Sequence, residues 1–124
     1  MQQDTPFTLF YVADPEASAR FYAGLLDRPA IEASPTFAMF TLGSGAMLGL
    51  WKRDTVAPAA SGAPGASELA FAVQGREAVD ARHAGWKALG CTVLQSPTVM
   101  DFGYTFTAQD PDGHRLRVFA PEGA

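Results

Sequence analysis

The segment Phe7-Thr-Leu-Phe-Tyr-Val-Ala-Asp-Pro-Glu-Ala-Ser-Ala-Arg-Phe-Tyr22 decides the fold, because it predicts a strand followed at once by a helix. Its first six residues are mostly aromatic or branched, which favours an extended strand. Asp14 is a good N-cap residue, and Pro15 suits the first position of a helix. Beyond this cap, apolar residues recur at helical spacing and predict one buried face: Phe21, Tyr22, Leu25 and Leu26.

The rest of the chain predicts the same module written twice. Three short strands should follow the first helix, at residues 30–33, 37–42 and 46–51, the last two joined by a hairpin turn at 43–45. The second half repeats this order with a strand at 68–73, a helix from about Arg76, and strands at 92–95, 104–109 and 115–120. The second helix should bury one face, carrying Val79, His83, Trp86 and Leu89.

Residues 54–66 are small, flexible or helix-breaking, and they predict a linker between the two modules. The order βαβββ, linker, βαβββ is an α+β arrangement. We therefore expect a single domain over residues 1–124, with module one at 7–53 and module two at 67–121.

Composition excludes several classes of protein. The 124 residues carry a formal charge of −4 and no cluster of Lys or Arg, so a nucleic-acid surface is not expected. No apolar run approaches the roughly 20 residues that cross a bilayer. Residues 1–6 lack the basic and apolar regions of a signal peptide, and the single cysteine forms no internal disulfide. We expect a cytoplasmic protein without a membrane partner.

The opening segment and the closing turn and strand, Asp110-Pro-Asp-Gly-His-Arg-Leu-Arg-Val-Phe-Ala-Pro121, together resemble the vicinal-oxygen-chelate superfamily. That group holds glyoxalases, ring-cleaving dioxygenases, and fosfomycin- and bleomycin-resistance proteins. The resemblance implies two paired modules that form a cup-shaped cleft. It also implies metal-ligand positions at the starts of the first and fifth strands and near the end of the eighth, with a fourth in some members.

In this chain those positions fall on Phe7, Glu68, Arg117 and Gly49. A phenylalanine offers no metal ligand, and an arginine brings a positive charge where a cation would sit. We therefore expect no metal and no other cofactor. We also expect no catalytic residues: His83, Asp101 and His114 are better explained as structural or solvated side chains.

Side chains along a strand alternate between the two faces of the sheet. The resemblance implies that the metal-ligand positions face the cleft, so the side chains on the same face as those positions are assigned to the cleft. The candidate ligand-binding residues are Trp51, Phe7, Tyr11, Met47, Gly49, Phe37, Glu68, Arg117 and Phe119. Among them, Trp51, Phe7 and Tyr11 should form a slot for a flat ring system. The alternative is that these residues are ordinary core or belong to a dimer interface.

Glu68 and Arg117 should be near neighbours, because their counterparts in metalloenzymes of the resembling family share one metal. The simpler interpretation is a salt bridge at the metal-ligand positions. In the other interpretation, Arg117 or Arg115 also receives a ligand carboxylate.

Within that family, the chain most resembles the metal-free antibiotic-binding branch. The resemblance lies in Glu68, the segments 116–118 and 102–106, and a fourth strand that ends in Trp51. This branch includes phenazine-, mitomycin- and bleomycin-resistance proteins. It implies sequestration of a planar aromatic small molecule by a homodimer. Two alternatives remain open: a metal-dependent lyase, isomerase or dioxygenase with an atypical site at Glu68, Asp101 or His114, and a protein whose cleft is mostly dimer interface.

Overall fold

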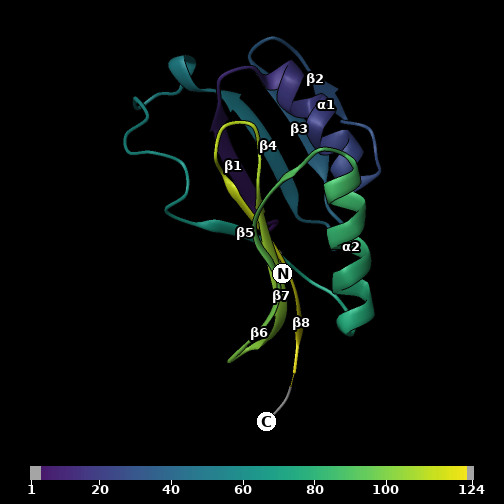
Figure 1. Ribbon diagram of the computed structural model, residues 1–124. Helices are drawn as coiled ribbons and strands as arrows, with labels where there is room; N and C mark the ends of the chain where they lie inside the picture. The colour runs from purple at the N-terminus through teal and green to yellow at the C-terminus, as the bar shows by residue number, and fades with distance from the viewer. Residues whose placement is uncertain (1–3, 123–124) are drawn as a thin grey trace. The chain divides into compact units, whose positions relative to one another are not determined.

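The computed structural model describes residues 4–122, so part of the N-terminal segment that we examined for a signal peptide lies outside it. The first module contains β1 (Phe7–Val12), α1 (Pro15–Leu26), β2 (Glu32–Ala33), β3 (Phe37–Thr41) and β4 (Met47–Lys52) (Figure 1). After a short 3-10 helix at Arg53–Thr55, the second module contains β5 (Glu68–Ala72), α2 (Arg76–Ala88), β6 (Thr92–Met100), β7 (Gly103–Gln109) and β8 (Arg115–Pro121).

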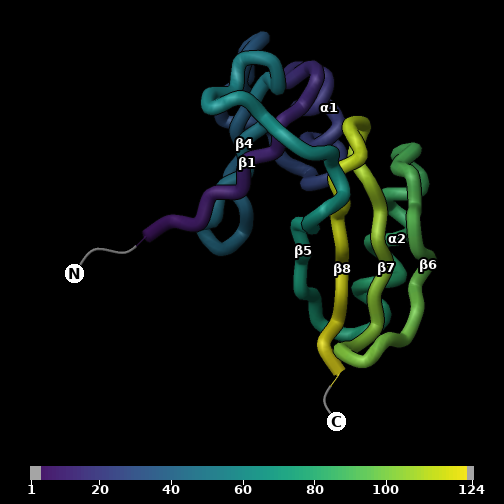
Figure 2. Tube along the Cα trace, turned by 90° about the vertical axis from the view of Figure 1, so that its left-hand side faces the viewer, coloured from purple at the N-terminus to yellow at the C-terminus, as the bar shows by residue number. Residues whose placement is uncertain are grey.

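The chain divides into two compact units, Met1–Gly62 and Ala63–Ala124, and each holds one module. The first sheet has the order β1-β4-β3-β2 and the second has the order β5-β8-β7-β6. The outer pairs β1–β4 and β5–β8 are parallel, whereas the other neighbours are antiparallel. Figure 2 shows the four strands of the second sheet side by side in this order. The predicted α+β fold with a repeated βαβββ module is confirmed.

In the first unit, α1 covers one face of its sheet. The Asp14 carboxylate accepts hydrogen bonds from the backbone N–H groups of Glu16 and Ala17, at 3.1 and 3.2 Å, and so caps the helix as predicted. Tyr22 is fully buried, and its ring lies 6.4 Å from that of Phe40 on β3. The buried core of this unit therefore lies between α1 and the sheet.

In the second unit, α2 covers its sheet in the same way (Figure 1). The rings of Trp86 and His83 both lie 5.3 Å from the ring of Phe106 on β7. Leu116 and Val118 of β8 are fully buried. The predicted apolar helix face is confirmed at Trp86 and at the half-buried His83, and β8 has the predicted core residues.

The structure corrects three details of the sequence analysis. Leu89 is exposed because α2 ends at Ala88 and the chain turns at Gly90, whose φ is +86°. Strand β6 continues to Met100 rather than ending at residue 95, since an edge strand tolerates Pro97 without losing a ladder hydrogen bond. The linker region begins with the 3-10 helix, and Val56 within it is buried.

No helix among residues 4–122 is long and apolar enough to span a membrane.

Candidate ligand-binding faces

Strand β1 divides its side chains between the two faces of the first sheet. Phe10 and Val12 are buried on the helix side, whereas Phe7 and Leu9 are 45% and 44% exposed on the opposite face. The parallel register sets Leu9 opposite Gly49 on β4. The predicted alternation of β1 is therefore confirmed, and it leaves large apolar side chains in contact with solvent.

An open, mostly apolar pocket of about 400 Å³ lies on this face, lined by Phe7, Leu9, Thr36, Phe37 and Trp51. Gly49 explains how these side chains come so close to the sheet. A Cβ atom at this position would lie 2.7 Å from Cδ2 of Leu9 and 2.8 Å from Cε1 of Phe7, so a larger residue would displace both. The absence of a side chain at Gly49 thus shapes the pocket.

The other two predicted residues of the first unit lie near the pocket but do not line it. The ring of Tyr11 packs edge-on against Trp51, with centroids 6.0 Å apart and planes at 85°. Met47 is half-buried beside Phe7 in the register of β1 and β4. Two lining residues were not among the predicted ones. Alternation had already placed Leu9 on this face, but Thr36 precedes β3 and carried no such signal.

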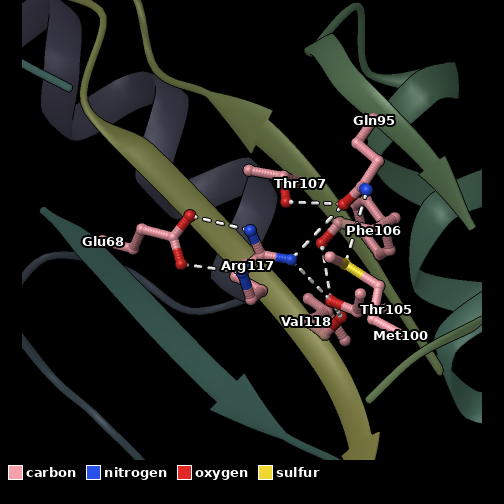
Figure 3. A network of polar contacts seen from close by, with 8 residues as sticks. All are labelled: Glu68, Gln95, Met100, Thr105, Phe106, Thr107, Arg117 and Val118. Carbon is pink, nitrogen blue, oxygen red and sulfur yellow. Dashed lines mark hydrogen bonds and ion pairs between the residues drawn. The ribbon is translucent and has the colours of Figure 1, made fainter. Parts of the chain in front are cut away.

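In the second unit, Glu68 and Arg117 form the predicted pair (Figure 3). The guanidinium donates from Nε to Oε1 of Glu68 at 2.7 Å and from Nη2 to Oε2 at 2.9 Å. The side chains are 17% exposed for Arg117 and 28% exposed for Glu68. This two-point, charge-assisted contact is of the strong kind that planar guanidinium and carboxylate groups make.

Arg117 also contacts the two strands beyond β8. Its Nη1 donates to Oγ1 of Thr105 on β7 at 3.1 Å and to Oε1 of Gln95 on β6 at 3.4 Å. Thr105 is fully buried and donates in turn to the backbone carbonyl of Val118, at 2.9 Å. Arg117 is therefore fixed by residues of three strands, and the sequence analysis had identified only Glu68.

The pair sets the charge state of its acidic member. The hydrogen bond from Arg117 is the main cause that holds the pKa of Glu68 below its usual value. The charges of Arg117 and Arg115 act in the same direction, whereas partial burial opposes them. Glu68 is therefore an ionised, paired carboxylate at neutral pH.

Phe119, the last predicted residue, lies beside an exposed aromatic ring. Its ring centroid is 5.9 Å from that of Phe102, at an interplanar angle of 81°. The Arg117 guanidinium lies 5.8 Å from the same Phe102 ring. Phe102 is 44% exposed and occupies the turn between β6 and β7. The face of the second unit thus combines an ion pair with an aromatic patch.

The residues at the metal-ligand positions of the resembling family do not fit a metal ion. Phe7 and Gly49 provide no donor atom, and Arg117 is a cation. Glu68 provides the one carboxylate, and that carboxylate is already held by Arg117 at both oxygens. Across residues 4–122, no three side chains of His, Cys, Asp or Glu, including Glu68, Asp101 and His114, come together as a group that could hold a metal ion.

A second hollow, of about 460 Å³, lies at the end of β1 and was not predicted. It is lined by Val12, Ala13, Arg53, Asp54, Val56, Ala59 and Ala60. Arg53 donates from Nη2 to the backbone carbonyl of Gly62 at 2.8 Å, so its guanidinium already holds the loop. None of the predicted site residues lines this hollow.

Known proteins are similar to this chain in both sequence and fold. The phenazine antibiotic resistance protein EhpR of Enterobacter agglomerans is 30% identical over 115 residues, which are 89% of this chain and 86% of that protein. A protein of Agrobacterium tumefaciens, solved by NMR in solution, is 52% identical with a TM-score of 0.87, over 98% of this chain and 100% of that one. A glyoxalase-related enzyme from Fulvimarina pelagi, at 24% identity, shares the fold with a TM-score of 0.82, over 99% of this chain and 94% of its own.

The family assignment follows from the extent of the match. The sequence pattern of one superfamily matches residues 6–118, which takes in every strand and helix of both modules up to the middle of β8. The chain belongs to the Glyoxalase/Bleomycin resistance protein/Dioxygenase superfamily.

Proposed function

We propose that this protein binds and sequesters a planar aromatic small molecule without the help of a metal ion. The observation that carries the proposal is the open apolar pocket lined in part by Phe7, Phe37 and Trp51. Two of its lining side chains, Phe7 and Leu9, lie close to the sheet because Gly49 has no side chain. The likeness to a phenazine antibiotic resistance protein supports the same class of ligand. Sequestration requires affinity alone, so it needs no acid, base or nucleophile in the site.

The size and the lining of the pocket suit such a ligand. Small-molecule sites commonly have volumes of about 300–1,000 Å³, lined mainly by apolar and aromatic groups. The pocket of about 400 Å³ falls in this range. Contact between aromatic rings adds about 0.5–1.5 kcal/mol beyond the burial of apolar area. A flat ring would also cover Phe7 and Leu9, whose exposure to water is unfavourable.

Metal independence is the second part of the proposal, and the donor set supports it. A single carboxylate already paired with Arg117 would have to give up two charge-assisted hydrogen bonds before it could bind a metal. The competing function is a metal-dependent lyase, isomerase or dioxygenase. Metal analysis of dialysed protein separates the two, because about one tightly bound zinc, iron, nickel or manganese ion per chain would favour the enzyme.

Fluorescence of Trp51 tests the binding site directly. In a Trp86→Phe background, phenazine and an anthraquinone should each quench Trp51 saturably, because the stacked ring lies against its indole. Gly49→Ala displaces the Leu9 and Phe7 side chains that line the pocket and should weaken binding by about fivefold or more, equivalent to about 1 kcal/mol. Gly43→Ala is the matched control, since a Cβ at Gly43 meets no atom within 4 Å.

Two results would overturn the proposal. If none of these compounds binds better than at millimolar concentration, the pocket is not a site for flat aromatic ligands. If Gly49→Ala and Gly43→Ala bind equally well, the ligand lies elsewhere. Retained thermal stability of both variants shows that any loss of binding comes from the pocket itself.

A further inference from the structure

The hollow of about 460 Å³ in the first unit lies where the carboxyl ends of two parallel strands meet. Strands β1 and β4 run in the same direction and pair Val12 with Lys52, so Ala13 and Arg53 follow at the same edge of the sheet. Val12 and Val56, which are 0% and 7% exposed, form part of the lining. Every lining residue belongs to the first unit, so that unit alone forms the hollow.

The turn that carries the two charged residues of the lining is held by hydrogen bonds. It is the 3-10 helix Arg53–Thr55, which follows β4. The hydroxyl of Thr55 donates to the backbone carbonyl three residues earlier at 2.7 Å, and the N–H of Val56 donates to the carbonyl of Arg53 at 3.3 Å. Nη2 of Arg53 donates to the carbonyl of Gly62 at 2.8 Å. These contacts limit the positions that Arg53 and Asp54 can take.

Both charged side chains keep unused binding capacity. A guanidinium carries five N–H donors, and within residues 4–122 one of those of Arg53 is engaged, by Gly62. In the same part of the chain Asp54 forms no ion pair, not even with its neighbour Arg53. The lining therefore presents one positive and one negative group that are not paired with each other.

The rest of the lining is apolar and small. Besides the two valines it consists of Ala13, Ala59 and Ala60, whose short side chains leave room for a ligand. The volume falls within the range of about 300–1,000 Å³ that is common for small-molecule sites. Asp54 would repel a simple anion and Arg53 would repel a simple cation. A ligand with separate opposite charges and an apolar substituent satisfies the whole lining.

We propose that this hollow binds a free α-amino acid with an apolar side chain. Arg53 receives the carboxylate through two N–H donors, and Asp54 receives the ammonium group. The valines and alanines of the lining contact the side chain of the ligand. The hollow shares no lining residue with the pocket of Phe7 and Trp51, so the inference goes beyond the proposed function and does not depend on it.

Calorimetry on the wild type with four probes tests this assignment. L-leucine carries all three recognised groups, N-acetyl-L-leucine lacks the ammonium group, L-leucinamide lacks the carboxylate, and glycine lacks the apolar side chain. At about pH 6.5 the amines of leucine and leucinamide are protonated. Leucine should bind about fivefold or more tightly than each of the other three, because each of them loses one of the contacts.

Two variants with matched controls assign the charged contacts. Asp54→Asn should weaken leucine binding by about fivefold but not that of N-acetyl-leucine, and Arg53→Gln should weaken leucine binding but not that of leucinamide. The exposed Asp27, a left-handed C-cap that Asn also suits, gives the control Asp27→Asn. Arg28 donates to a backbone carbonyl at 2.9 Å, as Arg53 does, and gives the control Arg28→Gln. Both controls should change leucine affinity by less than about twofold.

A ¹⁵N correlation spectrum of the wild type locates the ligand without any variant. Leucine should shift the backbone amide signals of Ala13, Ala59 and Ala60 saturably. The absence of such shifts at millimolar leucine would overturn the inference. Equal affinity for leucine and either charge-deficient analogue would also overturn it, as would equal effects of Asp54→Asn and Asp27→Asn. If Arg53→Gln loses thermal stability through its contact with Gly62, the comparison of the probes on the wild type decides the question.

Discussion

The Glu68–Arg117 pair should be energetically coupled, and its geometry gives the size of the effect. Removing one partner of a buried ion pair typically costs about 3–5 kcal/mol, because the other charge stays buried without compensation. Here Arg117 and Glu68 retain 17% and 28% of their exposure, so water recovers part of that loss. We expect Glu68→Leu or Arg117→Leu alone to lower the free energy of unfolding by about 2–4 kcal/mol.

The double variant should cost less than the sum of the single ones, because two apolar side chains leave no unpaired charge between them. A coupling free energy of about 1–2 kcal/mol is expected from urea unfolding of the four proteins in the cycle. The exposed pair Arg76–Glu122, with contacts of 2.5 and 2.8 Å, has the same two-point geometry and is the matched control. Its coupling should be smaller, since solvent screens it.

Effects of Glu68→Leu and Arg117→Leu that add within about 0.5 kcal/mol would refute this reasoning. The pH dependence gives a second check. The folded pKa of Glu68 is lowered, so its contribution to stability is fully present above its ordinary pKa of 4.5 and is lost as the pH falls through the lower folded value. The difference in stability between wild type and Glu68→Leu should therefore shrink only in that acidic range.

Two further predictions concern the fold and the assembly. Gly103 has a φ of +145° and a Cβ there would overlap the backbone carbonyl of Ala120, so Gly103→Ala should lower the unfolding free energy by about 2 kcal/mol or more, whereas Gly43→Ala should leave it nearly unchanged. A fall of equal size in both variants would show that the close approach at Gly103 does not matter. We also expect a homodimer, because Leu94 and Val99 on the edge strand β6 are 44% and 57% exposed and offer apolar surface outside the pocket that association would bury. Sedimentation at micromolar concentration would exclude this if it found only monomer.

Local sequence signals predicted most of the fold because each acts over a few residues. Asp14 and Pro15 set the start of α1, and alternation separated Phe10 from Leu9 on β1. The misplaced Leu89 shows where such signals fail. Helical spacing continued through it, but Gly90 turns the chain and ends the pattern one position earlier. Periodicity predicts the face of a helix more reliably than its last residue.

The candidate site was predicted where strands are regular and missed where they are not. Glu68 and Arg117 lie on β5 and β8, whose register runs without interruption. Gln95 lies on β6, where the register to β7 shifts on both sides of it. Counting alternate residues through such an irregularity cannot assign a face, because one extra residue reverses the direction of every later side chain.

The repeat explains why the two faces differ in chemistry. In each module, the first residue of the first strand lies beside a residue of the last strand, and the residue two positions further along the last strand points to the same face. Phe7 pairs with Met47, two residues before Gly49, and Glu68 pairs with Arg115, two residues before Arg117. In the first module this combination is an aromatic ring and a glycine, and the glycine lets the Phe7 and Leu9 side chains that line the pocket lie close to the sheet. In the second it is a carboxylate and a guanidinium, which fill the space and satisfy each other. One backbone thus carries an open apolar pocket in one module and an ion pair in the other.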